Sequence, residues 1–190
     1  VLRFEETSTI VPEMTQASGG LSGLTLNGRP LSTAADGPLA GGTLAAAFAI
    51  RDVTAPQAQA DLDALAQDLI DRFAASGLDS SQAAGAAGLF TDAGAALVDG
   101  NTVGLSQRLQ VNAAVDPNRG GALWRLRDGL AATAPGTVGN AQLLKDFATA
   151  LTADRSASSE RLASGARSFA SVSSELVSGV ASARVTAESE

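Results

Sequence analysis

The sequence predicts an α+β fold that is predominantly α, in which long helices pack side by side with a small antiparallel β portion. Residues 44–73 carry apolar side chains at the spacing of one helix face. Residues 162–183 repeat apolar or small side chains in alternating steps of four and three. Residues 1–31 alternate weakly between apolar and polar and contain Asn27-Gly28, a dipeptide that favours tight hairpin turns.

Composition excludes several classes of protein. The chain has 190 residues, a net charge of −7, and neither cysteine nor histidine. Disulfides, Cys/His zinc sites and catalysis by Ser-His-Asp or Cys-His are therefore excluded. The negative charge argues against nucleic acid and against an anionic membrane surface. No apolar run approaches the roughly 20 residues that span a bilayer, and no signal peptide is visible.

The N-terminal residues read as strands. We expect a strand over residues 1–14 and a hairpin around Asn27-Gly28, with Leu24 and Leu26 before the turn. Residues 32–42 are small, polar and contain Gly and Pro, so we expect a loop there.

The first long helical region is predicted over residues 43–75. Pro56 interrupts it, and we expect a kink there or two helices that meet. Gly77 is a plausible stop. Charged residues such as Asp63, Asp68 and Arg72 are expected mostly on the opposite, solvent-facing side. The apolar stripe consists of Leu62, Leu65, Ala66, Leu69, Ile70 and Phe73.

Residues 76–139 are predicted to form a short β insertion. Loops are expected over 76–88 and 94–101, around an extended piece at 89–92. Either a strand or a short helix fits residues 105–112, and a strand over 108–111 is favoured. The single tryptophan, Trp124, is interpreted as a hydrophobic plug for the helix face.

The second helical region is predicted over residues 140–188. Its first part places Leu143, Leu144, Phe147 and Leu151 on one face. Its last part has the spacing of a coiled-coil seam, although an ordinary amphipathic helix packed on the core fits the pattern equally well. The predicted assembly seam consists of Leu162, Ala166, Phe169, Ser173, Leu176, Val180 and Ala183.

The sequence shows no nucleophile, base and orienting group together, as a catalytic site would need. The carboxylate pairs are expected on solvent-facing surfaces. General acid/base catalysis needs two carboxyl groups in different environments, and a shared solvent face does not provide them. The segment Asp116 to Gly120 lacks the regularly spaced acidic ligands of a calcium loop, and Arg51 beside Asp52 suits a structural ion pair. We expect no catalytic, cofactor-binding or metal-binding residues, and no enzyme. The pairs are Glu5-Glu6, Asp61/Asp63 and Asp68/Asp71.

Several segments, in this order, resemble the C-terminal half of the flagellar hook-associated protein 1 family, the hook–filament junction proteins of bacteria. They are GPLAGGTLAAAFAIRD (37–52), LDALAQDLIDRF (62–73), LFTDAG (89–94) and LQVNAAVDPNRGGALWRLRDG (109–129). LTLNGRPL (24–31) resembles the end of that family's outer β-rich domain. The Ala-rich style is similar to alphaproteobacterial variants. The resemblance covers most of residues 20–190.

The resemblance implies a division of the chain into residues 1–31, the end of an outer β-rich domain, and residues 32–190, a helical core domain. It implies a structural adaptor that is extracellular, is exported by the flagellar type III apparatus without a cleaved signal peptide, and has no catalytic residues. Hook protein and other hook-associated proteins are the implied partners, with self-association in the assembled flagellum. The chain reads as an excised fragment, expected to be monomeric in solution. The alternative is a cell-surface adhesin or protein-binding module that uses the loops at 76–88 and 94–104.

Overall fold

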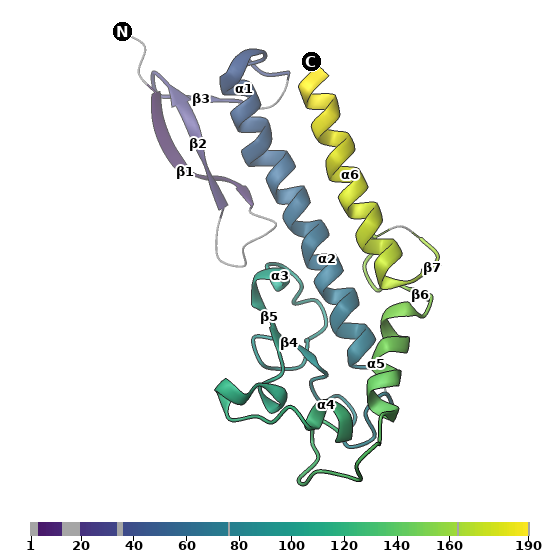
Figure 1. Ribbon diagram of the computed structural model, residues 1–190. Coiled ribbons are helices and arrows are strands. Elements are labelled where there is room, and N and C mark those ends of the chain that lie inside the picture. Colours follow the sequence, from purple (N-terminus) through teal and green to yellow (C-terminus); the bar gives the residue numbers. More distant parts are fainter. Residues whose placement is uncertain (1–3, 13–19, 34–35, 76, 163, 190) are drawn as a thin grey trace. The chain divides into compact units, whose positions relative to one another are not determined.

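The computed structural model describes residues 4–12, 20–33, 36–75, 77–162 and 164–189 (Figure 1). The chain forms two compact units, Val1–Leu62 and Asp63–Glu190, which we call the N-terminal unit and the C-terminal unit. The predicted fold class, a mostly helical α+β fold with small antiparallel sheets, is confirmed. The division at residue 31 concerns a family domain and stays a prediction.

The N-terminal unit contains a three-stranded antiparallel sheet in the order β1-β2-β3. Its strands are β1 (Phe4–Pro12), β2 (Gly20–Leu26) and β3 (Arg29–Leu31). The predicted hairpin is confirmed, because Leu26 pairs with Arg29 across Asn27 and Gly28. Both turn residues have positive φ, 51° at Asn27 and 76° at Gly28, which is the conformation that this dipeptide tolerates. Residues 1–3 and 13–14 of the predicted first strand lie outside the described residues.

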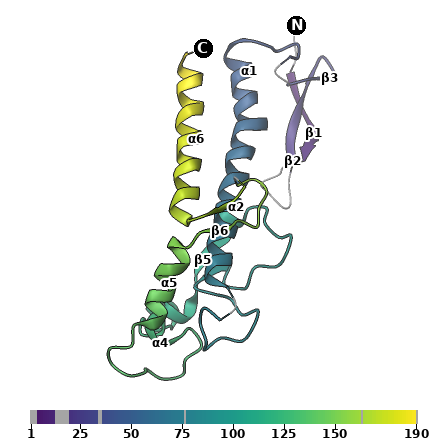
Figure 2. The same ribbon diagram turned by 90° about the vertical axis from the view of Figure 1, so that its right-hand side faces the viewer.

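The first long helix runs without a break through α1 (Gly42–Ala49), η1 (Ile50–Thr54) and α2 (Ala55–Phe73) (Figure 2). The middle segment, η1, is π-helical, and the N–H of Ala55 donates to the carbonyl of Ile50, five residues back. Pro56 follows at once. Since proline has no N–H and its ring crowds the carbonyl four residues back, a wider turn before it relieves both problems. The interruption predicted at Pro56 is thus a local widening rather than two separate helices.

Two hydrophobic clusters form the core of the C-terminal unit. The first consists of Ala66, Ile70 and Leu105. The second consists of Phe73, Leu143 and Phe147, so the end of α2 packs on α5 (Gln142–Thr152). Phe73 also meets Phe90 edge-on, with ring centroids 4.9 Å apart. The half-buried side chains packed against the clusters are Leu69, Leu78, Leu89, Phe90, Leu97, Leu109 and Leu126.

The predicted apolar stripe of α2 is largely correct. Ala66, Ile70 and Phe73 are at most 5% exposed, and Leu69 packs against the second cluster. Leu62, at the boundary between the two units, is 44% exposed and is therefore not part of the core.

The β insertion contains a two-stranded antiparallel sheet of β4 (Phe90–Asp92) and β5 (Leu109–Val111). Both strands were predicted, and a helical turn, α3 (Leu105–Arg108), precedes the second. The remaining elements are η2 (Ala113–Val115), η3 (Pro117–Arg119) and α4 (Arg125–Asp128).

Trp124 is only half-buried. It carries the guanidinium of Arg125 over its ring at 5.4 Å, and Leu126 is the neighbour that packs against the second cluster. Trp124 was predicted to pack on the helix face, but Leu126 is the residue of this segment that packs against the second cluster.

The region predicted as helical over 140–188 is two helices joined by a β-hairpin. After α5 come β6 (Arg155–Ser156) and β7 (Ala166–Arg167), which pair antiparallel, and then α6 (Phe169–Ser189). The prediction was therefore wrong for residues 153–168. The physical reason is the Ser/Gly-rich turn between the strands, where Gly165 has a φ of 104° that a helix cannot contain. The predicted face of α5 is correct for Leu143 and Phe147, while Leu144 and Leu151 are exposed.

Candidate functional site

Buried charged side chains on α2 are the main feature that sequence reasoning missed. Asp63 and Asp68 are 4% and 1% exposed, and Arg72 is 2% exposed. These residues were predicted to face solvent, and that prediction was wrong. The reason is that loops and hairpins of the C-terminal unit also cover the polar side of α2, and their backbone groups supply partners for the charges.

Asp63 accepts three hydrogen bonds from the start of α3. Its Oδ2 accepts from the backbone N–H of Gly104 at 2.7 Å, and its Oδ1 accepts from the N–H and the hydroxyl of Ser106 at 2.8 and 2.7 Å. The carboxylate thus satisfies backbone donors that a short helix leaves unpaired at its beginning. The described contacts of Asp63 thus hold the start of α3 against α2.

Arg72 joins three segments of the C-terminal unit. Its Nε donates to Asp68 Oδ2 at 2.7 Å, one helical turn earlier on α2. One terminal nitrogen donates to the carbonyls of Ala150 and Ala153 at 3.1 and 2.8 Å, at the end of α5. The other donates to the carbonyl of Arg167 at 2.7 Å, in β7.

A second ion pair holds the loop before α3. Arg108 donates to Asp92 at 2.6 Å through Nε, and also to the carbonyls of Val103 and Asn101. The hydrogen bond that Arg108 donates to Asp92 raises the pKa of Arg108, although burial opposes this shift. These hydrogen bonds therefore hold the C-terminal end of the loop at 94–104 in place.

The predicted loop at 76–88 is also tied to the fold. Asp79 accepts from the hydroxyl of Ser81 at 2.7 Å and from the backbone N–H of Leu130 at 2.7 Å. Gln82 donates to the carbonyl of Ala87 at 2.7 Å. These contacts leave less of this loop free for binding than the sequence suggested.

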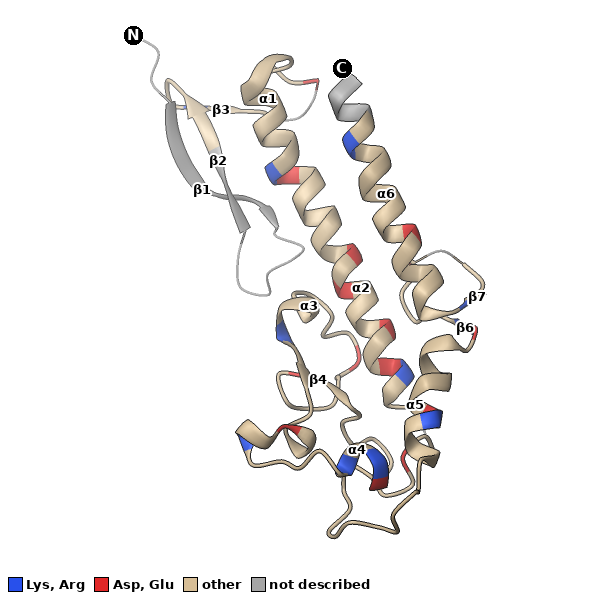
Figure 3. Cartoon of the chain, viewed as in Figure 1, with Lys and Arg blue, Asp and Glu red and all other residues tan. Residues whose placement is uncertain are grey.

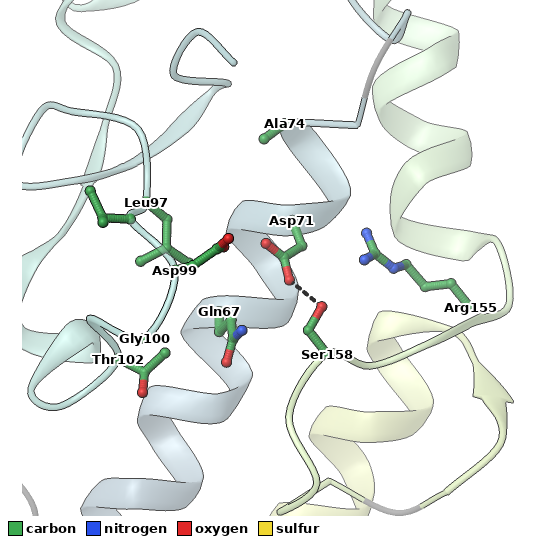
Figure 4. Close-up of a pocket in the computed structure, with 10 residues that line it drawn as sticks. Gln67, Asp71, Ala74, Leu97, Asp99, Gly100, Thr102, Arg155 and Ser158 are labelled. Carbon is green, nitrogen blue, oxygen red and sulfur yellow. Dashed lines mark hydrogen bonds between the residues drawn. The ribbon is translucent and has the colours of Figure 1, made fainter. Parts of the chain in front are cut away.

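A pocket opens between α2, the loop at 97–102 and the turn after β6 (Figure 4). Its volume is about 300 Å³. Figure 4 shows the side chains of Asp71 and Asp99 pointing toward each other, with Arg155 on the other side of Asp71. Ser158 donates to Asp71 at 2.6 Å. The lining residues are Gln67, Asp71, Ala74, Leu97, Val98, Asp99, Gly100, Thr102, Arg155 and Ser158.

The predicted assembly seam lies only partly on a helix. Leu162 lies in the turn after β6 and Ala166 in β7, so neither belongs to a helical seam, which corrects the prediction. Phe169, Ser173 and Leu176 lie on α6 and are half-buried.

The last two seam residues are exposed on α6. Val180 is 57% exposed, and Ala183 is exposed as well. Charge is sparse on this helix, as Figure 3 shows, and between 176 and 185 the one charged residue is Arg184. Val177 and Val185 are 67% and 66% exposed.

Two aspartates outside this region have lowered pKa values. Burial alone would raise the pKa of Asp52, but hydrogen bonds from Arg51 and Thr33, with the charge of Arg51, hold it below its ordinary value. The Arg51–Asp52 ion pair predicted from the sequence is thus confirmed, at 2.5 Å. Hydrogen bonds from Arg127, and one from the N–H of Gly136, lower the pKa of Asp128 against a smaller effect of burial.

Among the residues that the structure describes, no group of three or more acidic side chains is arranged to hold a metal ion. None of the described helices is long and apolar enough to cross a membrane. Asp116 accepts from the N–H of Asn118 and begins the turn η3, which is an ordinary local contact. Comparisons with protein families, with curated proteins and with solved structures found no match to this chain.

Proposed function

We propose that this chain is a structural adaptor of the bacterial flagellum that joins hook to filament. It acts by helix packing and subunit assembly, without catalysis. Its partners are hook protein and other hook-associated proteins, and it works outside the cell after export by the flagellar type III apparatus.

The observation that carries the proposal is the second half of α6. From Val177 to Val185 every residue is exposed, and three of the nine are valines. Exposed apolar surface on a helix is typical of surfaces that a partner covers. An enzyme would instead need a nucleophile or base held with its orienting group, and the buried carboxylates of the C-terminal unit are occupied by structural hydrogen bonds.

The structural positions of the segments that carry the family resemblance also support the proposal. LFTDAG at 89–94 supplies β4, and the segment at 109–129 supplies β5, η2, η3 and α4. These segments build the interior of the C-terminal unit, through Phe90, Leu109 and Leu126. The resemblance therefore rests on residues with structural roles rather than on surface composition.

Electron microscopy of bacteria that lack the protein tests the proposal. We expect intact hooks without filaments, restored when the wild-type gene is supplied. Normal filaments in the deletion strain would contradict the proposal.

The alternative, a cell-surface adhesin or protein-binding module, is favoured by one observation. The loop at 94–104 forms one wall of the pocket of Figure 4, and Val98 in it is 67% exposed. In that case the deletion strain would keep normal filaments and lose attachment to surfaces or to a partner protein.

A further inference from the structure

The C-terminal arm, by which we mean residues 154–162 and 164–185, is held to its unit in an unusual way. Neither hydrophobic cluster includes a described residue of the arm. Within the arm's described residues, Val172 is the one buried side chain, at 6% exposed. The arm's apolar burial therefore consists of Val172 and of half-buried side chains such as Phe169 and Leu176, outside both clusters.

Polar contacts take the place of apolar ones. Arg72 donates to the carbonyl of Arg167 at 2.7 Å, two residues before α6 begins. Ser158 donates to Asp71 at 2.6 Å, so a second contact from α2 reaches the turn after β6. Both contacts come from the same stretch of α2, one residue apart.

Arg72 is well placed to act as the main contact. It is nearly fully buried and is oriented by Asp68. Its contacts with Ala150 and Ala153 satisfy carbonyls that the last turn of α5 leaves without partners. The guanidinium therefore stays anchored on α2 and α5 whether or not the arm accepts its remaining hydrogen bond.

We propose that the arm opens and closes on the C-terminal unit as a single element, and that the guanidinium of Arg72 is the contact that holds it closed. Opening breaks the contact of Arg72 with Arg167 and the contact of Asp71 with Ser158. The two hydrophobic clusters remain intact, because their side chains belong to other segments. Such partial opening is common where a segment buries little apolar surface. The proposal does not depend on the proposed function.

Hydrogen exchange on the whole chain at increasing, sub-denaturing urea tests the proposal without any substitution. Once released, α6 lacks the packing that a short helix needs in water, so its own hydrogen bonds open as well. We therefore expect amides of Val172 to Leu176 to exchange through an opening that depends only weakly on urea. Amides of Ile70 and Leu105 should exchange through a strongly urea-dependent opening, because global unfolding exposes far more surface. The same urea dependence and the same protection in both groups would overturn the proposal.

Substitutions then identify the contact. Arg72→Gln should speed exchange in the arm by about tenfold or more, which is the scale for losing hydrogen bonds from a charged group. Arg108→Gln is the control, since Arg108 also forms an ion pair with an aspartate, Asp92, although a more exposed one. Its other hydrogen bonds go to the carbonyls of Val103 and Asn101, in the loop before α3. It should loosen the loop at 94–104 and leave the arm unchanged. Equal effects of both substitutions on the arm would overturn the assignment to Arg72.

Ser158→Ala is a second variant for the case in which Arg72→Gln prevents folding. Ser158 is exposed, so its removal leaves the core intact. Losing its hydrogen bond to Asp71 should speed exchange at Val172 by a few-fold, about two- to tenfold, with no change at Ile70. No change at Val172, or an equal change at both sites, would overturn the proposal.

Discussion

Arg72 donates its Nε–H to Asp68 Oδ2 over 2.7 Å, and both side chains are only 1% exposed. A buried ion pair is tolerated when its remaining donors and acceptors find partners. Each nitrogen of the guanidinium has a hydrogen-bond acceptor, three of them backbone carbonyls, whereas Asp68 Oδ1 has no hydrogen-bond partner among the described residues. Asp68 therefore depends on Arg72 for its hydrogen bond, whereas Arg72 has further partners on other segments.

Removing one member of this pair should be costly. Asp68→Ala leaves the buried charge of Arg72 without its counter-ion, so we expect the free energy of unfolding to fall by about 3–5 kcal/mol. Urea unfolding followed by circular dichroism measures the loss. Asp99→Asn is the control, because Asp99 is exposed and should change stability by less than about 0.5 kcal/mol. Equal stability of the two variants would show that the pair does not form.

The apolar face of α2 gives a second matched comparison. Ile70 is 2% exposed in the first cluster, so Ile70→Ala should lower the free energy of unfolding by about 2–5 kcal/mol. Leu62→Ala removes a side chain that is 44% exposed on the same helix and should cost clearly less. If Leu62→Ala were the more destabilising change in urea, the core would lie on another face of α2.

Two glycines should respond to alanine in opposite directions. A Cβ on Gly121 would lie 2.1 Å from the carbonyl oxygen of Ala113, so the backbone must move and we expect a loss of about 1–3 kcal/mol or more. A Cβ on Gly179 meets nothing within 4 Å, and in a helix Gly→Ala adds about 1 kcal/mol of local stability. Thermal unfolding of Gly121→Ala and hydrogen exchange along α6 in Gly179→Ala check the two effects. A stabilised Gly121→Ala would contradict the packing described.

Acid should weaken the fold partly through Asp128. Arg127 lowers the pKa of this carboxyl in the folded state, below the value of about 3.9 expected when unfolded. The unfolded state then binds the proton more tightly, so the stabilisation is present above about pH 4 and is lost as pH falls through the folded pKa. Urea unfolding between about pH 5 and pH 2 should show a smaller acid-induced loss in Asp128→Asn than in the wild type. Parallel pH profiles would contradict the role of Arg127.

Much of the fold was predictable because local patterns agreed with it. The hairpin at Asn27-Gly28, the helix ending in Phe73 and the strand pair β4 and β5 all follow from turn chemistry and periodicity. The burial of Asp63 and Asp68 did not follow. Asp63 is bound by Gly104 and Ser106, 41 or more residues away in the sequence. Asp68 is bound by Arg72, whose other partners lie 78 or more residues away. Spacing along one helix holds no information about such contacts.

The seam illustrates a different limit. A four-and-three pattern from Leu162 onward is equally compatible with one helix and with a hairpin that precedes a helix, because Leu162 and Ala166 fit the repeat by position alone. Gly165 and the serines before it were the signal for the turn, and turn residues outweigh a weak periodicity of small side chains. The pocket around Asp71 had no sequence signal, since three distant segments form it.

Immunogold labelling of the protein on isolated flagella tests the adaptor proposal most directly. An antibody against residues 94–104, which include exposed residues such as Val98 and Asp99, is a suitable probe. We predict that the label is confined to the boundary between hook and filament. Label spread over the cell surface, or its absence from flagella that carry complete filaments, would contradict the proposal.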